Sequence, residues 1–525
     1  MRRARAWLAG LGWPDRAGLA VALGGALLVL ASAWLLRRTY GGDPSIYLSY
    51  ARNAADGNPF QYNPGEFSSG STSPLWALVL ALPYLVCADA EGAKLVSAAV
   101  TLAAFGLCVW AAWRAAGSLL AAAVAALFVV TVLSLNGLLV YESGLIVALV
   151  AATVPLGLRV AGTESPGARD LAPLAVVWGA MILTRPESVI LVGLQCLVLG
   201  WTAFGHRPRE LVTPVAAAAL AAIPAAIYYG YSLAELGTPS TSTQGRAFQF
   251  RELDLERLGP LYLDSGALSY VTSAPAVWAM IAALAGLAVL ARSGPRWLAL
   301  YAGGGILAYL GVLTLVTPGS YDTERYLLPV APLVVVAAAH ALRAARAHPA
   351  ALVAAGAIGV LIAVDAVQVP VDIRDRDRSR YELRTIVHGD AADRLNELAA
   401  PGDTVLAYEV QIRYALRDDL DVLSLDGITD GKVHDYAERD DITGFLMRYR
   451  PRWWVLDTST DPGGRPYLGR SVLGRAARQL IADPRRTRFS GDGIDFDVAF
   501  RRTGELPYRT GAWRMVVELR YPDGA

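Results

Sequence analysis

Long apolar runs separated by short polar segments recur along the first 369 residues of this 525-residue chain. Runs of roughly 20 apolar residues are long enough to cross a bilayer as α-helices. The pattern predicts about eleven such spans and hence an α-helical polytopic protein that has the lipid bilayer as its partner. The spans are 17–36, 93–113, 118–134, 144–161, 171–184, 187–204, 211–229, 273–291, 297–316, 326–342 and 349–369.

One apolar run, Pro74–Cys87, is too short for a span and is typical of an interfacial or re-entrant segment. Charge supports this interpretation, because with the N-terminus inside and this run skipped, every inside loop contains arginine. These arginines are Arg2, Arg3, Arg5, Arg16, Arg114, Arg159, Arg169, Arg207, Arg209, Arg292, Arg296, Arg343 and Arg346. Such a bias predicts a cytoplasmic N-terminus and an extracytoplasmic C-terminal region. The N-terminal segment shows no obvious small-residue cleavage site, which predicts an uncleaved first span.

Composition agrees with a membrane protein, since 54% of the residues are apolar and only 18% are charged. The net charge of +1 gives no indication of a nucleic-acid partner. The three cysteines lie in apolar segments and show neither a disulfide framework nor metal-ligand spacing.

The chain changes character after about residue 370, where charged residues become frequent. The segments 403–410, 421–427 and 451–457 are typical of short strands, and 391–400 and 440–450 of helices between them. This alternation predicts a small extracytoplasmic α/β domain over 370–525, after a transmembrane module over 1–369. The C-terminal region contains no GxGxxG, P-loop, HExxH or CxxC motif, so no nucleotide or metal role is supported.

The predicted topology gathers the most distinctive polar segments on the outer face. They are 41–76, 141–144, 184–187, 237–246 and 321–326. Ionisable groups gathered at one membrane face indicate a functional site there. The first of these segments is long and rich in turn-forming and aromatic residues, which favours a functional loop over a simple connection.

Residues 43–57 of that first loop predict a short helix, with Asp43 as N-cap, Pro44 as first helical residue and Gly57 as stop. A capping role would by itself account for Asp43. In the alternative interpretation its carboxylate projects toward a cavity, with Tyr47 and Tyr50 on the same helical face. A carboxylate beside aromatic rings is suited to bind and deprotonate a sugar hydroxyl.

After this helix, Asn63-Pro64-Gly65-Glu66 predicts a turn, and 68–73 is a strip of small polar residues. With these motifs the chain resembles polytopic glycosyltransferases of the GT-C superfamily, which use polyprenyl-phosphate sugars. The resemblance is to actinobacterial arabinofuranosyltransferases and their mannosyltransferase-like relatives. The matching residues of the first loop are Asp43, Ile46-Tyr47, Tyr50-Ala51-Arg52-Asn53, Gly57, Phe60, Tyr62-Asn63-Pro64-Gly65-Glu66 and Thr72-Ser73-Pro74-Leu75-Trp76.

Further matches run through the rest of the chain. They are Glu142, Leu183-Thr184-Arg185-Pro186-Glu187, Pro239, Arg246, Arg325-Tyr326-Leu327-Leu328-Pro329 and Leu425-Asp426-Gly427-Ile428-Thr429-Asp430. Two departures from the family pattern stand out. The family often has two adjacent acids where this chain has Gly42-Asp43, and a Ser-Gly-x-Glu motif where it has Tyr-Glu142-Ser-Gly.

The resemblance implies transfer of arabinofuranose, or another pentose or hexose, from a polyprenyl-phosphate donor to a cell-envelope glycan or glycoconjugate. Asp43 and Glu142 would be catalytic, with Asp43 as base or electrostatic stabiliser. The implied contacts to the donor phosphate are Arg185, Arg246, Arg325 and Arg52, since arginine binds phosphate oxygens in pairs. The implied substrate contacts are Tyr47, Tyr50, Asn63, Glu66, Thr72, Glu187 and Tyr326.

Structural roles compete with these assignments. Arg185 and Arg325 could anchor spans at the interface, and Glu187 could simply pair with Arg185. No cofactor is implied, and a divalent cation is left open.

Two other classes of function compete with a transferase. A transporter or flippase of lipid-linked sugars should show internal repeats and ionisable residues deep within its spans. The sequence shows neither, and its charges cluster at span ends. A non-catalytic scaffold that recruits cell-wall enzymes is the third class. Frequent Ala and Arg with little Lys indicate a GC-rich bacterium, so we expect a multi-pass protein of the bacterial plasma membrane.

Overall fold

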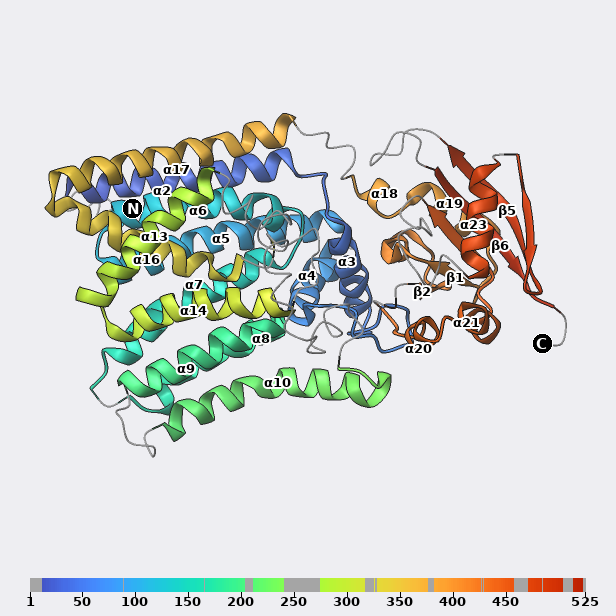
Figure 1. The fold of residues 1–525 in the computed structure, drawn as a ribbon, viewed down its shortest axis with the longest axis horizontal. Helices are drawn as coiled ribbons and strands as arrows, with labels where there is room; N and C mark the ends of the chain where they lie inside the picture. The colour runs from blue at the N-terminus through green and yellow to red at the C-terminus, as the bar shows by residue number, and fades with distance from the viewer. Residues whose placement is uncertain are drawn as a thin grey trace. The chain divides into compact units, whose positions relative to one another are not determined.

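The computed structural model describes residues 12–87, 89–164, 166–203, 211–239, 274–316, 325, 328–375, 382–425, 427, 429–457, 471–483, 485–503 and 513–522 (Figure 1). The chain forms two compact units. The first comprises residues 1–37, 91–228 and 247–376. The second comprises residues 38–90, 229–246 and 377–525. The second unit therefore contains the first polar loop as well as the C-terminal region.

The first unit is a bundle of apolar helices (Figure 1). They are α2 (Trp13–Leu35), α5 (Ala90–Ala116), α6 (Leu119–Leu138), α7 (Ser143–Ala161), α8 (Ala168–Thr184), α9 (Val189–Ala203), α10 (Val212–Leu236), α13 (Ala274–Ser293), α14 (Arg296–Val316), α16 (Ala331–Ala344) and α17 (Pro349–Asp375). Every predicted span overlaps one of these helices. Within the described residues, seven helical stretches are long and apolar enough to cross a membrane. The chain is thus a multi-pass membrane protein, as predicted.

Small residues allow helices of this bundle to approach closely. A side-chain carbon on Gly286 of α13 would overlap the backbone of Ala337 in α16. Likewise, Gly18 of α2 lies against the backbone of Leu120 in α6. Close backbone approach at small residues is how membrane helices gain packing energy without a hydrophobic driving force between them. Large apolar side chains such as Leu27 and Val353 remain exposed, as expected for helix faces in contact with lipid.

The second unit is built on a six-stranded sheet in the order β2-β1-β3-β6-β5-β4. Its strands are β1 (Thr404–Ala407), β2 (Asp421–Ser424), β3 (Trp453–Asp457), β4 (Arg488–Gly491), β5 (Ile494–Thr503) and β6 (Trp513–Arg520). The first three pair in parallel, whereas β6, β5 and β4 join them as antiparallel strands. The predicted α/β domain is therefore present, and the antiparallel half extends it.

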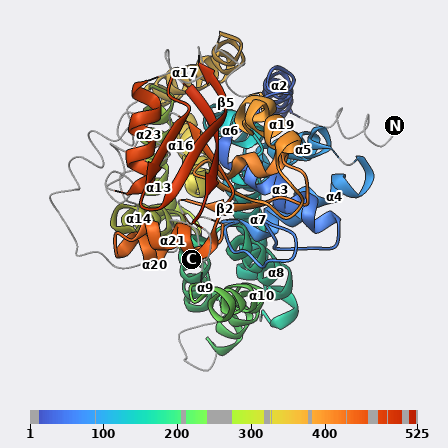
Figure 2. The ribbon, with the colours of Figure 1, turned by 90° about the vertical axis from the view of Figure 1, so that its right-hand side faces the viewer.

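Alternate residues of the strands face opposite sides of the sheet. Leu406, Trp454 and Val517 enter a core covered by α20 (His434–Glu438), α21 (Ile442–Tyr449) and α23 (Val472–Ala482). Val405 and Val455 enter the core on the other face, which α19 (Gly389–Leu398) and η7 (Val410–Ala415) cover. Figure 2 shows α23 and α19 on opposite sides of the sheet.

The first polar loop folds into two helices of this second unit, α3 (Gly42–Ala55) and α4 (Pro74–Cys87). Helix α4 has only 14 residues and contains Pro83. It buries Trp76, Leu80 and Tyr84, while Leu82 and Leu85 are exposed. One face of α4 thus packs into the unit, and the other presents apolar side chains outward.

Candidate functional site

A buried cluster of charged residues lies where α7 begins and α8 ends. Glu142 directly precedes α7, and Arg185 follows α8. One guanidinium nitrogen of Arg185 donates to Glu142 Oε1 at 2.6 Å, and the other donates to Glu187 Oε1 at 2.5 Å. All three residues are at most 8% exposed. Arg185 therefore bridges two carboxylates that come from different helical segments.

Local sequence explains how Arg185 reaches both partners. It precedes Pro186, and the residue before a proline is disfavoured in helical conformation. Arg185 accordingly has an extended backbone, with φ −149° and ψ 115°, and ends α8. Pro186 then starts the short helix η1 (Pro186–Ser188), which carries Glu187 back beside the guanidinium.

A second arginine adds positive charge to this cluster. Arg325 is buried, and its guanidinium carbon lies 4.8 Å from the ring centre of Tyr141. Arg325 also lies close enough to Arg185 for the two charges to interact. Three predicted site residues of the first unit, Glu142, Arg185 and Glu187, are thus in direct contact, with Arg325 near them.

From the sequence, no role was predicted for Lys94, which contacts the end of α6 shortly before Tyr141 and Glu142. Its ammonium donates to the carbonyl of Leu138, the last residue of α6, and the side chain is buried. The available signal was a lysine just inside the apolar run of α5, because ionisable residues in such runs are costly and have specific partners.

Asp43 occupies the first turn of α3. The predicted N-cap is wrong by two residues, since α3 begins at Gly42 and its N-cap is Gly41, without a side-chain capping bond. The backbone amides of a first helical turn favour a negative charge, so Asp43 suits this position without capping. The predicted stop is correct, because Gly57 follows the helix with φ +90°. Asp43 is partly exposed.

Three predicted substrate contacts lie on α3 and the polar strip after it, namely Tyr47, Tyr50 and Thr72. The hydroxyl of Tyr47 lies 2.6 Å from Thr72 Oγ1. The hydroxyl of Tyr50 is hydrogen bonded to Ser68, and its ring packs against Tyr62 at 5.6 Å between ring centres. Burial raises the pKa of Tyr50 above its ordinary value, so the phenol stays protonated in this setting.

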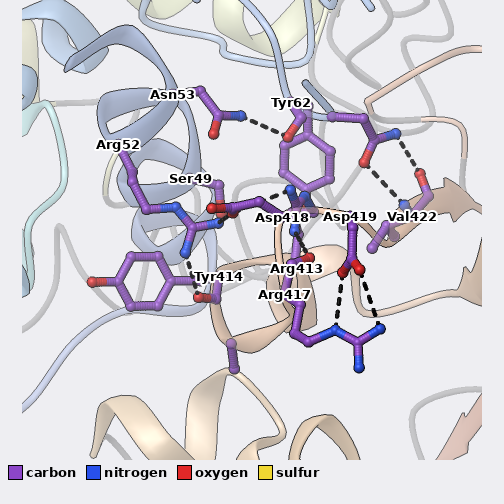
Figure 3. A network of polar contacts seen from close by, with 12 residues as sticks. Ser49, Arg52, Asn53, Tyr62, Arg413, Tyr414, Arg417, Asp418, Asp419 and Val422 are labelled. Atoms are coloured by element: carbon purple, nitrogen blue, oxygen red, sulfur yellow. Dashed lines mark hydrogen bonds and ion pairs between the residues drawn. The ribbon is translucent and has the colours of Figure 1, made fainter. Parts of the chain in front are cut away.

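Three other predicted site residues contact the C-terminal segment. Arg52 donates to the carbonyl of Tyr414 at 3.1 Å and pairs with Asp418 at 3.1 Å (Figure 3). Asn63 binds the backbone of Val422, and Glu66 pairs with Lys432 at 2.9 Å. The other two predicted residues, Arg246 and Tyr326, lie outside the described residues.

No group of three or more His, Cys, Asp and Glu residues capable of holding a metal ion occurs in the part of the chain that the structure describes.

Comparison with solved structures shows which known fold the chain shares. The structure superimposes on that of ArnT from Cupriavidus metallidurans in the apo state, with a TM-score of 0.55, 15% identity and 98% of each chain covered. The chain has the fold of ArnT. The undecaprenyl phosphate-bound form of ArnT matches with a TM-score of 0.54 and 14% identity, over 95% of this chain and 97% of ArnT. This likeness confirms the predicted GT-C-like fold with a C-terminal α/β region. No protein-family model and no curated protein sequence matches the chain.

Proposed function

We propose that this protein is a membrane glycosyltransferase that transfers a sugar from a polyprenyl-phosphate donor to a cell-envelope glycan or glycoconjugate. The supporting observation is the buried cluster of Glu142, Arg185 and Glu187 with Arg325 beside it. Two arginines and two carboxylates kept at one end of an apolar bundle are costly, and such groups usually mark a substrate site. ArnT, whose fold the chain shares, binds undecaprenyl phosphate.

In this proposal the arginines bind the donor phosphate. A guanidinium fork can contact two phosphate oxygens and keeps its charge at any physiological pH. Arg185 and Arg325 are the described candidates, and Arg246 is a third. Their positive charge would also stabilise the polyprenyl phosphate that leaves, since its oxygen gains charge as the bond to the sugar breaks.

Asp43 takes the proton in this mechanism. The acceptor hydroxyl oxygen attacks the anomeric carbon, the bond between that carbon and the phosphate oxygen breaks, and the hydroxyl proton passes to the carboxylate of Asp43. The same carboxylate could instead stabilise the positive charge that develops on the sugar ring. Glu142 is the second proposed catalytic acid, and Tyr47 with Thr72 offers hydroxyl groups for sugar recognition.

The site is proposed to face the extracytoplasmic side, with a cytoplasmic N-terminus, because the arginine-rich loops predict that orientation. Arabinofuranose is the proposed sugar on account of the first-loop motifs shared with arabinofuranosyltransferases. A transporter of lipid-linked sugars and a non-catalytic scaffold remain the competing classes, and both predict no sugar transfer.

Sugar transfer by the purified protein in lipid nanodiscs tests the proposal. A panel of polyprenyl-phosphate pentoses and hexoses would serve as donors and cell-envelope glycan fragments as acceptors. Removal of a general base should lower kcat/KM by at least about 100-fold in Asp43→Asn. Asp56→Asn, an exposed aspartate at the end of the same helix, is the matched control. Undiminished transfer by folded Asp43→Asn would rule out a catalytic role of Asp43. No transfer by the native protein with any donor of the panel would contradict the proposed glycosyltransferase activity.

A further inference from the structure

The segment Tyr62-Asn63-Pro64-Gly65-Glu66 of the first loop has three side chains that contact the C-terminal region. We propose that this block docks the first loop onto the C-terminal domain, and that Asn63 is the positioning residue that sets the place of α3. The consequence for catalysis rests on the proposed function, because α3 carries Asp43.

Asn63 occupies the open edge of the sheet. Strand β2 is the last described strand on its side of the sheet, and within the described residues no strand pairs with its outer edge. The side-chain amide of Asn63 donates to the carbonyl of Val422 at 2.9 Å, and the amide of Val422 donates to Asn63 Oδ1 at 2.9 Å. With one N–H and its carbonyl oxygen, the carboxamide of Asn63 thus pairs with Val422 as the backbone of another strand would.

The neighbours of Asn63 extend the same contact. The hydroxyl of Tyr62 donates to the carbonyl of Val410, and Glu66 pairs with Lys432. Ser68 donates to the carbonyl of Thr429. Gly65 makes the intervening turn with φ +90°, a backbone conformation that glycine adopts without strain.

The block is tied to α3 by a second asparagine. The side-chain amide of Asn53, in the last turn of α3, donates to the carbonyls of Gln61 and Tyr62, both at 2.9 Å. Figure 3 shows the bond to Tyr62. A continuous set of hydrogen bonds therefore leads from β2 through Asn63 and the Tyr62 backbone to α3. Arg52 on the same turn adds the pairing with Asp418.

Apolar packing makes the same connection. Ile46 and Tyr50 of α3 share one buried core with Val405 of β1 and Val455 of β3. Helix α3 is thus one of the elements that cover this face of the sheet. Because a packed core has few alternative arrangements, the C-terminal domain fixes the helix on which Asp43 lies.

Hydrogen exchange and kinetics together test the proposal in the full-length protein in nanodiscs. In Asn63→Ala, exchange of the Val422 amide should accelerate roughly five- to tenfold, about the effect of one lost hydrogen bond. Exchange in α3 should also accelerate. Asn58→Ala is the matched control, since Asn58 lies in the same loop and its side chain makes no hydrogen bond to the described residues of the C-terminal segment.

With an active donor, Asn63→Ala should lower kcat by roughly tenfold with little change in KM for the donor, as expected for misplacement of a catalytic group. Tyr62→Phe removes only the hydroxyl and tests the same contact if Asn63→Ala does not fold. Unchanged exchange at Val422 would overturn the docking, and faster exchange with unchanged kcat would overturn the positioning role. If the native protein transfers no sugar, the proposed function fails, whereas the exchange result still decides the docking.

Discussion

Arg185 has two carboxylate partners inside a bundle of apolar helices, and this arrangement makes it sensitive to substitution. Arg185→Ala would leave Glu142 and Glu187 buried without their shared cation. Loss of one partner of a buried ion pair costs about 3–5 kcal/mol. We expect a clear drop in the Tm of Arg185→Ala, and only partial recovery in Arg185→Lys, because a lysine ammonium cannot bridge two carboxylates as a guanidinium fork does.

The control for Arg185 is Arg169→Ala, which removes an exposed arginine from the first turn of α8. Its effect should stay within about 0.5 kcal/mol, as for most surface substitutions. Thermal unfolding of the purified variants in one detergent measures both. An unchanged Tm of Arg185→Ala would show that the two carboxylates are protonated or solvated in the native protein.

Asp430 is a second residue for which burial has a measurable consequence. Burial raises the pKa of Asp430 to about 6, although the backbone amides of Ser424 and Lys432 donate to its carboxylate. A carboxyl whose pKa is higher in the folded than in the unfolded state stabilises the fold at low pH. This contribution is full below the unfolded pKa near 4 and is lost as the pH rises through about 6.

We therefore expect the wild type to lose roughly 2–3 kcal/mol from Asp430 between pH 4 and pH 6.5. Asp430→Asn should remove this part of the pH dependence, whereas exposed Asp435→Asn should retain it. The difference in unfolding free energy between wild type and Asp430→Asn, measured across that pH range, isolates the contribution. A difference that is constant with pH would contradict the raised pKa.

At the scale of elements, the C-terminal domain depends on helix α3 from the first loop. One face of its sheet is covered by helices of its own segment, such as α21 and α23. The core on the other face includes Ile46, Tyr50 and Tyr62. Residues 377–525 expressed alone would expose that apolar surface, and we expect them to aggregate and to bind a hydrophobic dye.

A fusion in which a flexible linker joins residues 38–90 to the fragment 377–525 should be monomeric. A scrambled linker-fused segment of the same composition is the control. Size-exclusion chromatography and the cooperativity of unfolding are the measurements. A monomeric fragment 377–525 that unfolds cooperatively without the added segment would contradict the shared core.

Individual helices and strands could be predicted from the sequence more readily than the elements with which they pair. The apolar runs predicted the bundle helices because length and hydropathy are local properties. Strands β1, β2 and β3 were also predicted from short apolar segments. Strands β4 to β6 were not, although β5 alternates Asp495, Phe496, Asp497 and Val498. Their antiparallel pairing depends on residues distant in the chain.

In the candidate site too, contacts between residues close in sequence could be predicted, whereas contacts between distant residues could not. Arg185 and Glu187 are two residues apart, and their pairing was among the expected alternatives. Asn63 was predicted to lie in a turn and to contact substrate, but its described partner Val422 lies 359 residues further along the chain. A turn motif indicates backbone shape, and it contains no information about which distant strand edge the side chain meets.

At the scale of the whole molecule, the helices of the first unit have several arginines at one end and the ion-paired Arg185 at the other. At one end, Arg343 of α16 donates to the carbonyl of Ala116, the last residue of α5. The loop between α7 and α8 is flanked by Arg159 and Arg169. The carboxylate-bridging Arg185 instead follows the last residue of α8, at the helix end opposite to Arg169. The arginine-rich ends are the ones that the positive-inside rule assigns to the cytoplasm.

Orientation can be tested with single cysteines. We predict that Glu164→Cys, in the α7–α8 loop, reacts with an impermeant maleimide only from the cytoplasmic side, and Asp56→Cys only from the outside. Both positions are exposed. The background would carry Cys87→Ser, while Cys108 and Cys196 are buried and can stay. Three predicted spans separate the two positions, so they must lie on opposite sides. Labelling of both from one side would require α4 to span the membrane or one of the helices α5, α6 and α7 not to do so.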